Sequence, residues 1–289
     1  MKRRGKIWIG ISGWTYARWR GQFYPKGLRQ SEELAYAASI FRSIEINGSF
    51  YRLQTPDIFA RWAAETPRDF VFAVKAPRFL THVRRLRNPA VPLANFLASG
   101  LLRLGPKLGP VLWQFPPSFR FDAELLDRFL HLLPHDTEAA ATQARRHDGR
   151  LKARAWLRAN VARPLRHAIE IRHESFRNPQ FIDMLREHDV ALVCADTVDW
   201  PRLMDITSDF IYCRLHGSEE LYRSAYTDKA LKTWATRVRA WSEGKPLPVG
   251  DYASGRKAKK MPRDVFVYFD NTDKLQAPAD AQALMRKVE

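Results

Sequence analysis

Residues 43–47 read Ser-Ile-Glu-Ile-Asn, an alternation that is typical of a β-strand with one face packed against apolar side chains. Seven further short runs rich in β-branched and aromatic residues recur along the chain. The eight runs are 7–11, 43–47, 70–74, 111–114, 167–171, 190–194, 210–215 and 265–269. Helical patterns separate them, and this order predicts βα units with a parallel sheet.

The segments between the runs carry residues that favour helix N-termini. Asp122, Asn178 and Asp228 each precede a stretch whose apolar residues recur every three or four positions. After Asp228, for example, Leu231 and Trp234 fall on one face of the predicted helix. We therefore expect helices that bury one apolar face against the sheet.

Eight strands with helical connections in 289 residues predict a single α/β domain, a (β/α)8 TIM-like barrel, because such barrels typically hold about 250 residues. An open doubly wound sheet is the alternative, but no strand is followed by the glycine pattern of a dinucleotide-binding loop. Two basic stretches interrupt the alternation. Residues 136–166, rich in Ala and Arg, are expected to form an inserted helix, and residues 244–263, rich in Lys, Pro and Gly, a mobile loop.

The composition suits a folded protein with a large core and anionic partners. It is 45% apolar, and 48 Lys and Arg against 31 Asp and Glu give a formal net charge of +17. Two cysteines in so long a chain exclude a disulfide scaffold, and Cys194 and Cys213 lie in apolar runs, where we expect them to be buried. No run approaches the roughly 18 apolar residues that cross a membrane. We therefore expect a cytoplasmic protein without a membrane partner.

Polar side chains gather at the carboxyl ends of the eight runs, and the alternation points them into the barrel, where barrel enzymes carry their chemistry. The predicted catalytic residues are Glu45, Lys75, Glu170 and Asp270. The predicted substrate contacts are Asn47, Gln114, Arg172, Asp196, Arg214, His216 and Asn271, with the loop aromatics Trp14, Tyr16 and Tyr51. The structural alternatives are an ion-paired plug that closes the barrel and an aromatic cluster that pins the loops.

Seven motifs of the chain resemble the DUF72 family, also called YecE-like. They are IGISGWTY at 9–16, GQFYP at 21–25, EINGSFY at 45–51, WQFPP at 113–117, EIRHESF at 170–176, RLHG at 214–217 and YFDNT at 268–272. The resemblance runs nearly end to end and implies a TIM-like barrel whose activity is not established. Its motifs coincide with the predicted mouth of the barrel, while residues 136–166 depart from the family's usual compactness.

The mixture of acids and bases at the mouth favours acid–base chemistry on a phosphate-bearing substrate, either a small anion or nucleic acid. In this interpretation Glu170 transfers a proton, while Arg172 and Arg214 bind the anion. Lys75 stabilises developing negative charge. The predicted activity is that of a hydrolase or lyase.

Other chemistries stay open. One divalent ion on the carboxylates Glu45, Glu170, Asp196 or Asp270 is chemically feasible. A three-zinc cluster would need more inward histidines than His216. The two functional alternatives are nucleic-acid binding without chemistry, through the basic segments 2–6, 78–87, 145–166 and 256–260, and glycoside hydrolysis by paired carboxylates.

Overall fold

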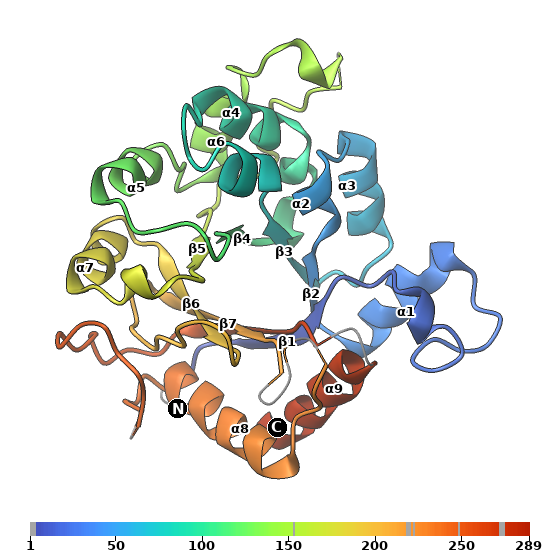
Figure 1. Ribbon diagram of the computed structural model, residues 1–289. Helices are drawn as coiled ribbons and strands as arrows, with labels where there is room; N and C mark the ends of the chain where they lie inside the picture. The colour runs from blue at the N-terminus through green and yellow to red at the C-terminus, as the bar shows by residue number, and fades with distance from the viewer. Residues whose placement is uncertain (1–3, 153, 218–220, 222, 248, 272–274) are drawn as a thin grey trace.

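The computed structural model describes residues 4–152, 154–217, 221, 223–247, 249–271 and 275–289. Eight parallel strands close into a barrel in chain order, with β1 paired to β8 (Figure 1). The strands are β1 (Ile7–Ser12), β2 (Ser43–Ile46), β3 (Val71–Lys75), β4 (Leu108–Gln114), β5 (His167–Glu170), β6 (Ala191–Asp196), β7 (Phe210–Leu215) and β8 (Asp264–Phe269). The predicted (β/α)8 barrel is confirmed.

Helices surround the strands on the outside (Figure 1). They are α1 (Glu33–Ile40), α2 (Gly48–Tyr51), α3 (Pro56–Ala64), α4 (Ala90–Ala98), α5 (Ala123–Leu130), α6 (Thr137–Ala144), α7 (Pro179–Glu187), α8 (Asp228–Ser242) and α9 (Gln276–Val288). The connection from β6 to β7, residues 197–209, contains no helix, so the expected βα alternation fails at this point. None of the described helices is long and apolar enough to span a membrane.

The predicted helix starts are close to the observed ones. The side chains of Asp122 and Asn178 accept hydrogen bonds from the backbone N–H groups of Leu125 and Gln180, as N-caps do. Asp228 was expected to cap α8, but the cap is Thr227, whose hydroxyl serves the same purpose one residue earlier. The apolar stripe of α8 is buried as predicted.

Alternation along the strands divides the core into two clusters. One lies between strands and helices and holds most of the large apolar side chains, together with the buried free cysteines Cys194 and Cys213. The other fills the barrel from its amino end, where Trp8 stacks on Phe266 with ring centroids 4.6 Å apart. Apolar packing stops halfway up the barrel, and charged side chains occupy the carboxyl end.

The first basic stretch differs from its predicted form, whereas the second is a loop, as predicted. Of the expected inserted helix, only Thr137–Ala144 is α-helical, and it contains no Lys or Arg; a short 3-10 turn, Gly149–Leu151, follows it. The arginines follow it, in a segment that folds back so that the backbone N–H of Trp156 donates to the carbonyl of Ala98. The described part of 244–263 contains neither a helix nor a strand before β8, and Asp251 ties it to Arg177 through two hydrogen bonds of 2.6 and 2.9 Å.

Candidate active site

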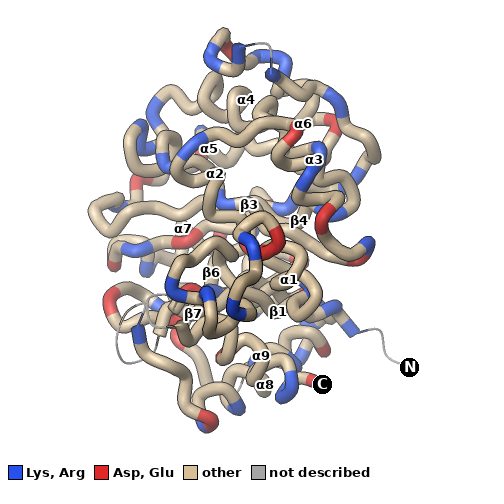
Figure 2. Tube along the Cα trace, turned by 90° about the vertical axis from the view of Figure 1, so that its right-hand side faces the viewer, with Lys and Arg blue, Asp and Glu red and all other residues tan. Residues whose placement is uncertain are grey.

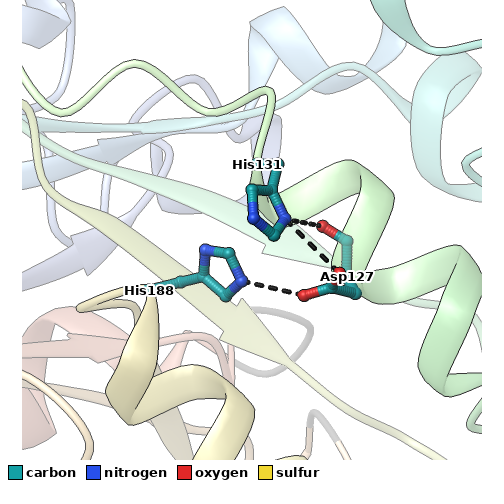
Figure 3. A group of neighbouring side chains, drawn as sticks. All are labelled: Asp127, His131 and His188. Atoms are coloured by element: carbon teal, nitrogen blue, oxygen red, sulfur yellow. Dashed lines mark hydrogen bonds and ion pairs between the residues drawn. The ribbon is translucent and has the colours of Figure 1, made fainter.

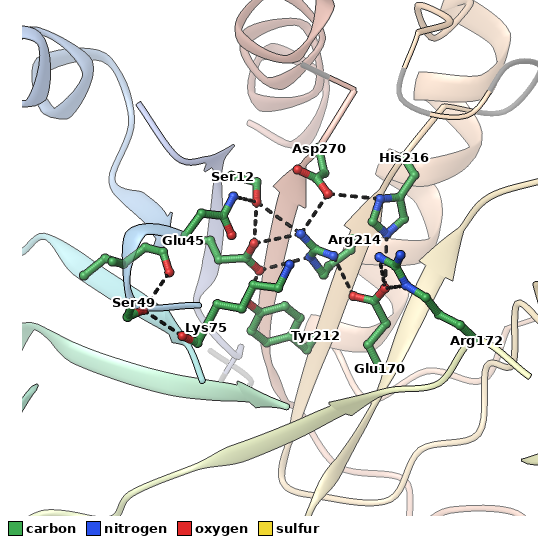
Figure 4. A network of polar contacts seen from close by, with 12 residues as sticks. Ser12, Glu45, Ser49, Lys75, Glu170, Arg172, Tyr212, Arg214, His216 and Asp270 are labelled. Carbon is green, nitrogen blue, oxygen red and sulfur yellow. Dashed lines mark hydrogen bonds and ion pairs between the residues drawn. The ribbon is translucent and has the colours of Figure 1, made fainter. Parts of the chain in front are cut away.

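Arg214 of β7 lies at the centre of a charged network inside the carboxyl end of the barrel (Figure 4). Its Nη1 donates to Oε2 of Glu170 at 2.6 Å, and its Nη2 donates to Oδ2 of Asp270 at 2.8 Å. Glu45 accepts from Nε at 3.1 Å and from Nη2 at 2.9 Å. The side chains of Arg214, Glu45 and Glu170 are fully buried. Three carboxylates from separate strand ends therefore share one guanidinium.

Glu45 is also held by hydroxyl groups of neighbouring strands. Tyr212 donates from its hydroxyl to Oε2 of Glu45 at 2.6 Å, and Ser12 donates to Oε1. Asn47 in turn donates from Nδ2 to the Ser12 hydroxyl at 2.9 Å. Both carboxylate oxygens have several donors, so Glu45 is fixed inside the barrel.

Glu170 and Asp270 connect Arg214 to two further bases. Arg172 donates from Nε to Oε1 of Glu170 at 2.8 Å. His216 has its Nδ1 3.2 Å from Oδ2 of Asp270 and its Nε2 3.7 Å from Oε1 of Glu170. The network resembles the ion-paired plug named above as a structural alternative, because its carboxylates face cations on several sides.

The network fixes the protonation of its carboxyl groups. Burial raises the pKa of Glu170, but the charges of Arg172 and Arg214 outweigh burial and hold this pKa well below its usual range. The pKa of Asp270 is likewise lowered, against burial, mainly by Arg214. Both groups therefore stay ionised at neutral pH. Glu170 is poorly suited to the proton transfer that the sequence suggested for it, because a general acid or base works best with a pKa near the working pH.

Lys75, the last residue of β3, differs from the other charged residues of the network (Figure 4). It is 8% exposed, and its Nζ lies 4.3 Å from the centroid of the Phe50 ring. Among the residues that the structure describes, Nζ has no hydrogen bond or ion pair. Burial, followed by the charge of Arg214, lowers the pKa of Lys75 to about 8. Lys75 is thus a buried cation that titrates close to neutral pH.

Trp200 shapes one side of this end of the barrel and was not predicted from the sequence. The guanidinium of Arg172 lies 4.2 Å from the centroid of the Trp200 ring, which also meets His216 edge to face at 5.7 Å. Trp200 comes from the helix-free connection between β6 and β7, where no hydrophobic periodicity indicates the position of a side chain.

His82 lies close to Lys75 and Arg172 and was also not predicted as a site residue. Its ring packs edge to face on Phe50 at 5.1 Å. Burial and the neighbouring charges of Lys75 and Arg172 lower the pKa of His82 to about 4, so the ring is neutral at pH 7. His82 lies in a short π-helical segment after β3, Phe79–Val83, which gives no sequence signal that would bring it beside Phe50.

Asp196 does not point into the barrel, and the prediction that placed it there is wrong. Val193 of β6 faces the interior, so Cys194 and Asp196 face outward. Oδ2 of Asp196 accepts a hydrogen bond of 3.0 Å from Nε1 of Trp234 in α8, and Oδ1 accepts one of 2.7 Å from Arg202. Asp196 therefore anchors the outer layer.

Asn271 has a structural position as well. Its Nδ2 donates to Oδ2 of Asp280 in α9 at 2.7 Å and to the carbonyl of Ser224 at 3.0 Å. These bonds tie the end of β8 to the outer layer, away from the charged network. Thr272, which ends the last resemblance motif, lies outside the described residues.

The loop aromatics mostly form the alternative aromatic cluster. Trp14 packs edge to face on Trp62 of α3 with centroids 5.1 Å apart. Tyr16 packs on Trp19 at 4.6 Å. Tyr51 is 71% exposed and stands outside the network. These contacts pin the loops, as the second structural alternative describes.

Gln114 and the carboxylates complete the predicted set. Gln114 ends β4, is buried, and pairs in register with Glu170 of β5, as expected from the alternation.

Oxygen ligands such as those of Glu45, Glu170 and Asp270 suit Mg²⁺ or Mn²⁺. All three carboxylates bind Arg214, however, so a divalent ion among them would compete with the guanidinium.

Fold and site together define a TIM-like barrel with a buried ion network at the carboxyl ends of its strands. Residues 8–289 match the family described as "Protein of unknown function DUF72", and the chain belongs to this family. The resemblance noted in the seven motifs is thereby confirmed.

Named relatives agree with this assignment. UPF0759 protein YunF of Bacillus subtilis is 32% identical over 118 residues, which are 39% of this chain and 41% of that protein. UPF0759 protein YecE of Escherichia coli K12 is 30% identical over 113 residues, 39% of each chain. The match thus spans about two fifths of the length of these curated relatives.

Solved structures of the family have the same architecture. A DUF72 family protein from Thermotoga maritima superposes with a TM-score of 0.72 at 24% identity, covering 97% of this chain and 98% of that one. One from Enterococcus faecalis superposes with a TM-score of 0.64 at 18% identity, covering 98% of each chain. At these identities the likeness supports the barrel fold alone.

Proposed function

We propose that this protein is an enzyme that acts on a phosphate-bearing substrate at the carboxyl end of the barrel. One observation carries the proposal: the ammonium of Lys75 is buried, yet it has neither a hydrogen bond nor an ion pair among the described residues. Buried charges are stable when they are paired. The carboxylates Glu45, Glu170 and Asp270 act on the Lys75 ammonium only from beyond ion-pair distance, so the substrate is expected to supply its direct counter-ion.

In the proposed mechanism, protonated Lys75 contacts the anionic group and acts as the general acid. A water molecule attacks phosphorus and loses a proton to solvent while the bond between phosphorus and the leaving oxygen breaks. Lys75 transfers a proton from Nζ to that leaving oxygen, and solvent then reprotonates Lys75. A pKa of about 8 suits this role, because the donor is mostly protonated at neutral pH and still acidic enough to give up its proton. Arg172, with a side chain that is 10% exposed, supplies the second cationic contact.

The carboxylates have a supporting part in this mechanism. Glu45, Glu170 and Asp270 hold the guanidinium of Arg214 in place. That positive charge in turn lowers the pKa of Lys75. The role of proton donor thus moves from Glu170 to Lys75, while Glu170 becomes a positioning residue for Arg172 and Arg214.

The two alternatives have weaker support. Glycoside hydrolysis needs one protonated carboxyl group as general acid, whereas the pKa values of Glu170 and Asp270 are lowered. For nucleic-acid binding, the described parts of segments 145–166 and 256–260 lie far apart around the barrel, one beyond α4 and α6 and the other near α7 and α8 (Figure 1). Along the chain trace, Lys and Arg positions are spread over the molecule with Asp and Glu positions among them (Figure 2).

A substrate panel tests the proposal. We expect the purified chain to turn over at least one class among phosphomonoesters, phosphodiesters and oligonucleotides, assayed with and without Mg²⁺, Mn²⁺ and Zn²⁺. Inorganic phosphate should inhibit competitively, because it would occupy the place of the substrate's anionic group beside Lys75. Turnover of glycosides alone, or salt-dependent oligonucleotide binding without any turnover, would favour the corresponding alternative and contradict the proposal.

A further inference from the structure

We propose that Asp127, His131 and His188 form a zinc-binding site on the outer surface of the barrel, separate from the proposed active site (Figure 3). Asp127 lies in α5, and His131, four residues further along the chain, directly follows the last residue of that helix. His188 follows the end of α7. One donor atom from each of the three residues lies within 4.8 Å of the other two.

The two histidines flank the Asp127 carboxylate, one at each of its oxygens. Nε2 of His188 lies 3.0 Å from Oδ1 of Asp127, and Nδ1 of His131 lies 3.4 Å from Oδ2. Zinc–ligand distances of about 2.0–2.1 Å place neighbouring tetrahedral ligands roughly 3.4 Å apart. The three donor atoms lie within 4.8 Å of one another, so side-chain rotations must draw them closer to surround one ion. The Nδ1 of His131 would exchange its hydrogen bond to the Asp127 carbonyl for the metal.

The donor types also favour zinc over harder cations. Two imidazoles and one carboxylate are a ligand set that zinc uses in open sites, with water in the fourth position. Mg²⁺ and Ca²⁺ prefer oxygen donors throughout. A groove of about 630 Å³ borders Asp127 and His131, which gives the ion and its water access from solvent.

Exposure and the surrounding charge set the expected strength of the site. His188 is 10% exposed, whereas Asp127 and His131 are 45% and 66% exposed. Arg128 lies beside Asp127, although it pairs with Glu124 at 3.3 Å, and Arg87 lines the same groove. These two arginines oppose a cation, so we expect micromolar rather than nanomolar affinity.

Zinc at this position would join α5 to α7. The ligands come from the connections that follow β4 and β5, which are 61 residues apart between Asp127 and His188. An ion that binds the folded chain better than the unfolded chain raises the melting temperature with increasing concentration. A higher melting temperature in zinc is therefore a second readout besides binding itself.

The test is isothermal titration of zinc sulfate into the untagged, chelator-treated full chain, with calcium chloride in parallel. We expect one zinc ion per chain, no binding of calcium, and a loss of affinity of at least about tenfold in His131→Ala and in His188→Ala. The melting temperature should rise with zinc in the wild type and not in His131→Ala or His188→Ala. His131 is largely exposed, so His131→Ala keeps the test valid if His188→Ala fails to fold.

His147→Ala is the matched control, because His147 is a partly buried histidine outside the cluster, bonded to the carbonyl of Asp148. It should bind zinc as the wild type does. The proposal is overturned if the wild type binds no zinc at submillimolar concentration, or if His131→Ala binds it as tightly as the wild type. In either case the three side chains only form hydrogen bonds that link α5 to α7.

Discussion

Replacing Arg214 by methionine is expected to lower the free energy of unfolding by about 3–5 kcal/mol, the usual effect of removing one partner from a buried ion pair. The variant leaves Glu45, Glu170 and Asp270 without the guanidinium they share. Urea-induced unfolding measures the difference. The loss in free energy of unfolding should be largest above about pH 4, the ordinary carboxyl pKa. It should become smaller at lower pH, because protonation removes the negative charges that Arg214 compensates.

Arg128→Ala provides the control for Arg214→Met. Arg128 pairs with Glu124 at 3.3 Å, but the two side chains are 65% and 86% exposed. Exposed ion pairs contribute at most about 1 kcal/mol, so this variant should unfold almost as the wild type does. An Arg214→Met variant no less stable than Arg128→Ala would mean that the network does not hold the barrel together.

Replacing Lys75 by methionine is expected to lower kcat by about 10²–10⁴-fold on whichever phosphate-bearing substrate the panel identifies, the usual contribution of a general acid. In the wild type, kcat/KM should be constant below pH 8 and fall as the pH rises through about 8, because the active form is the ammonium. The residual activity of the variant should lack this decline. Activity that instead rises through pH 8 would assign Lys75 the role of a base.

The free energy of unfolding distinguishes a catalytic role of Lys75 from a structural one. Because the pKa of Lys75 is lowered on folding, the unfolded chain binds more protons between pH 8 and 10.5, and wild-type stability should rise with pH across that window. Lys75→Met should lack this rise and lose no stability at pH 7. Lys107→Met is the contrast, since Nζ of Lys107 donates to the carbonyls of Ala63 and Thr66. That variant should lose stability and keep its activity.

Most of the fold could be predicted from the sequence, because strand alternation repeats in every unit. The same alternation places Glu45, Glu170 and Arg214 together, since each stands at an inward position near a strand end. The alternation was misapplied to Asp196. Cys194 faces outward, and Asp196, two residues further along β6, faces the same side. Correctly applied, the rule would have excluded Asp196.

The remainder of the site depends on contacts that no local pattern encodes. Trp200 and His82 reach the mouth from irregular connections, and their positions follow from packing on Arg172 and Phe50. The protonation state of a buried group likewise depends on charges that come from distant parts of the sequence. The pKa of Glu170 is lowered by arginines on its own strand end and on β7, so residue type alone misassigns it as the proton donor.

The most direct test of the anion-binding role is a nuclear magnetic resonance titration of the Lys75 side chain in protein labelled at lysine Cε, with Lys75→Met used to assign the signal. We expect a pKa of about 8 without ligand. Added inorganic phosphate should raise this pKa, because an anion beside Nζ stabilises the ammonium. A pKa near the ordinary lysine value of about 10.4 that phosphate leaves unchanged would contradict an anion site at Lys75.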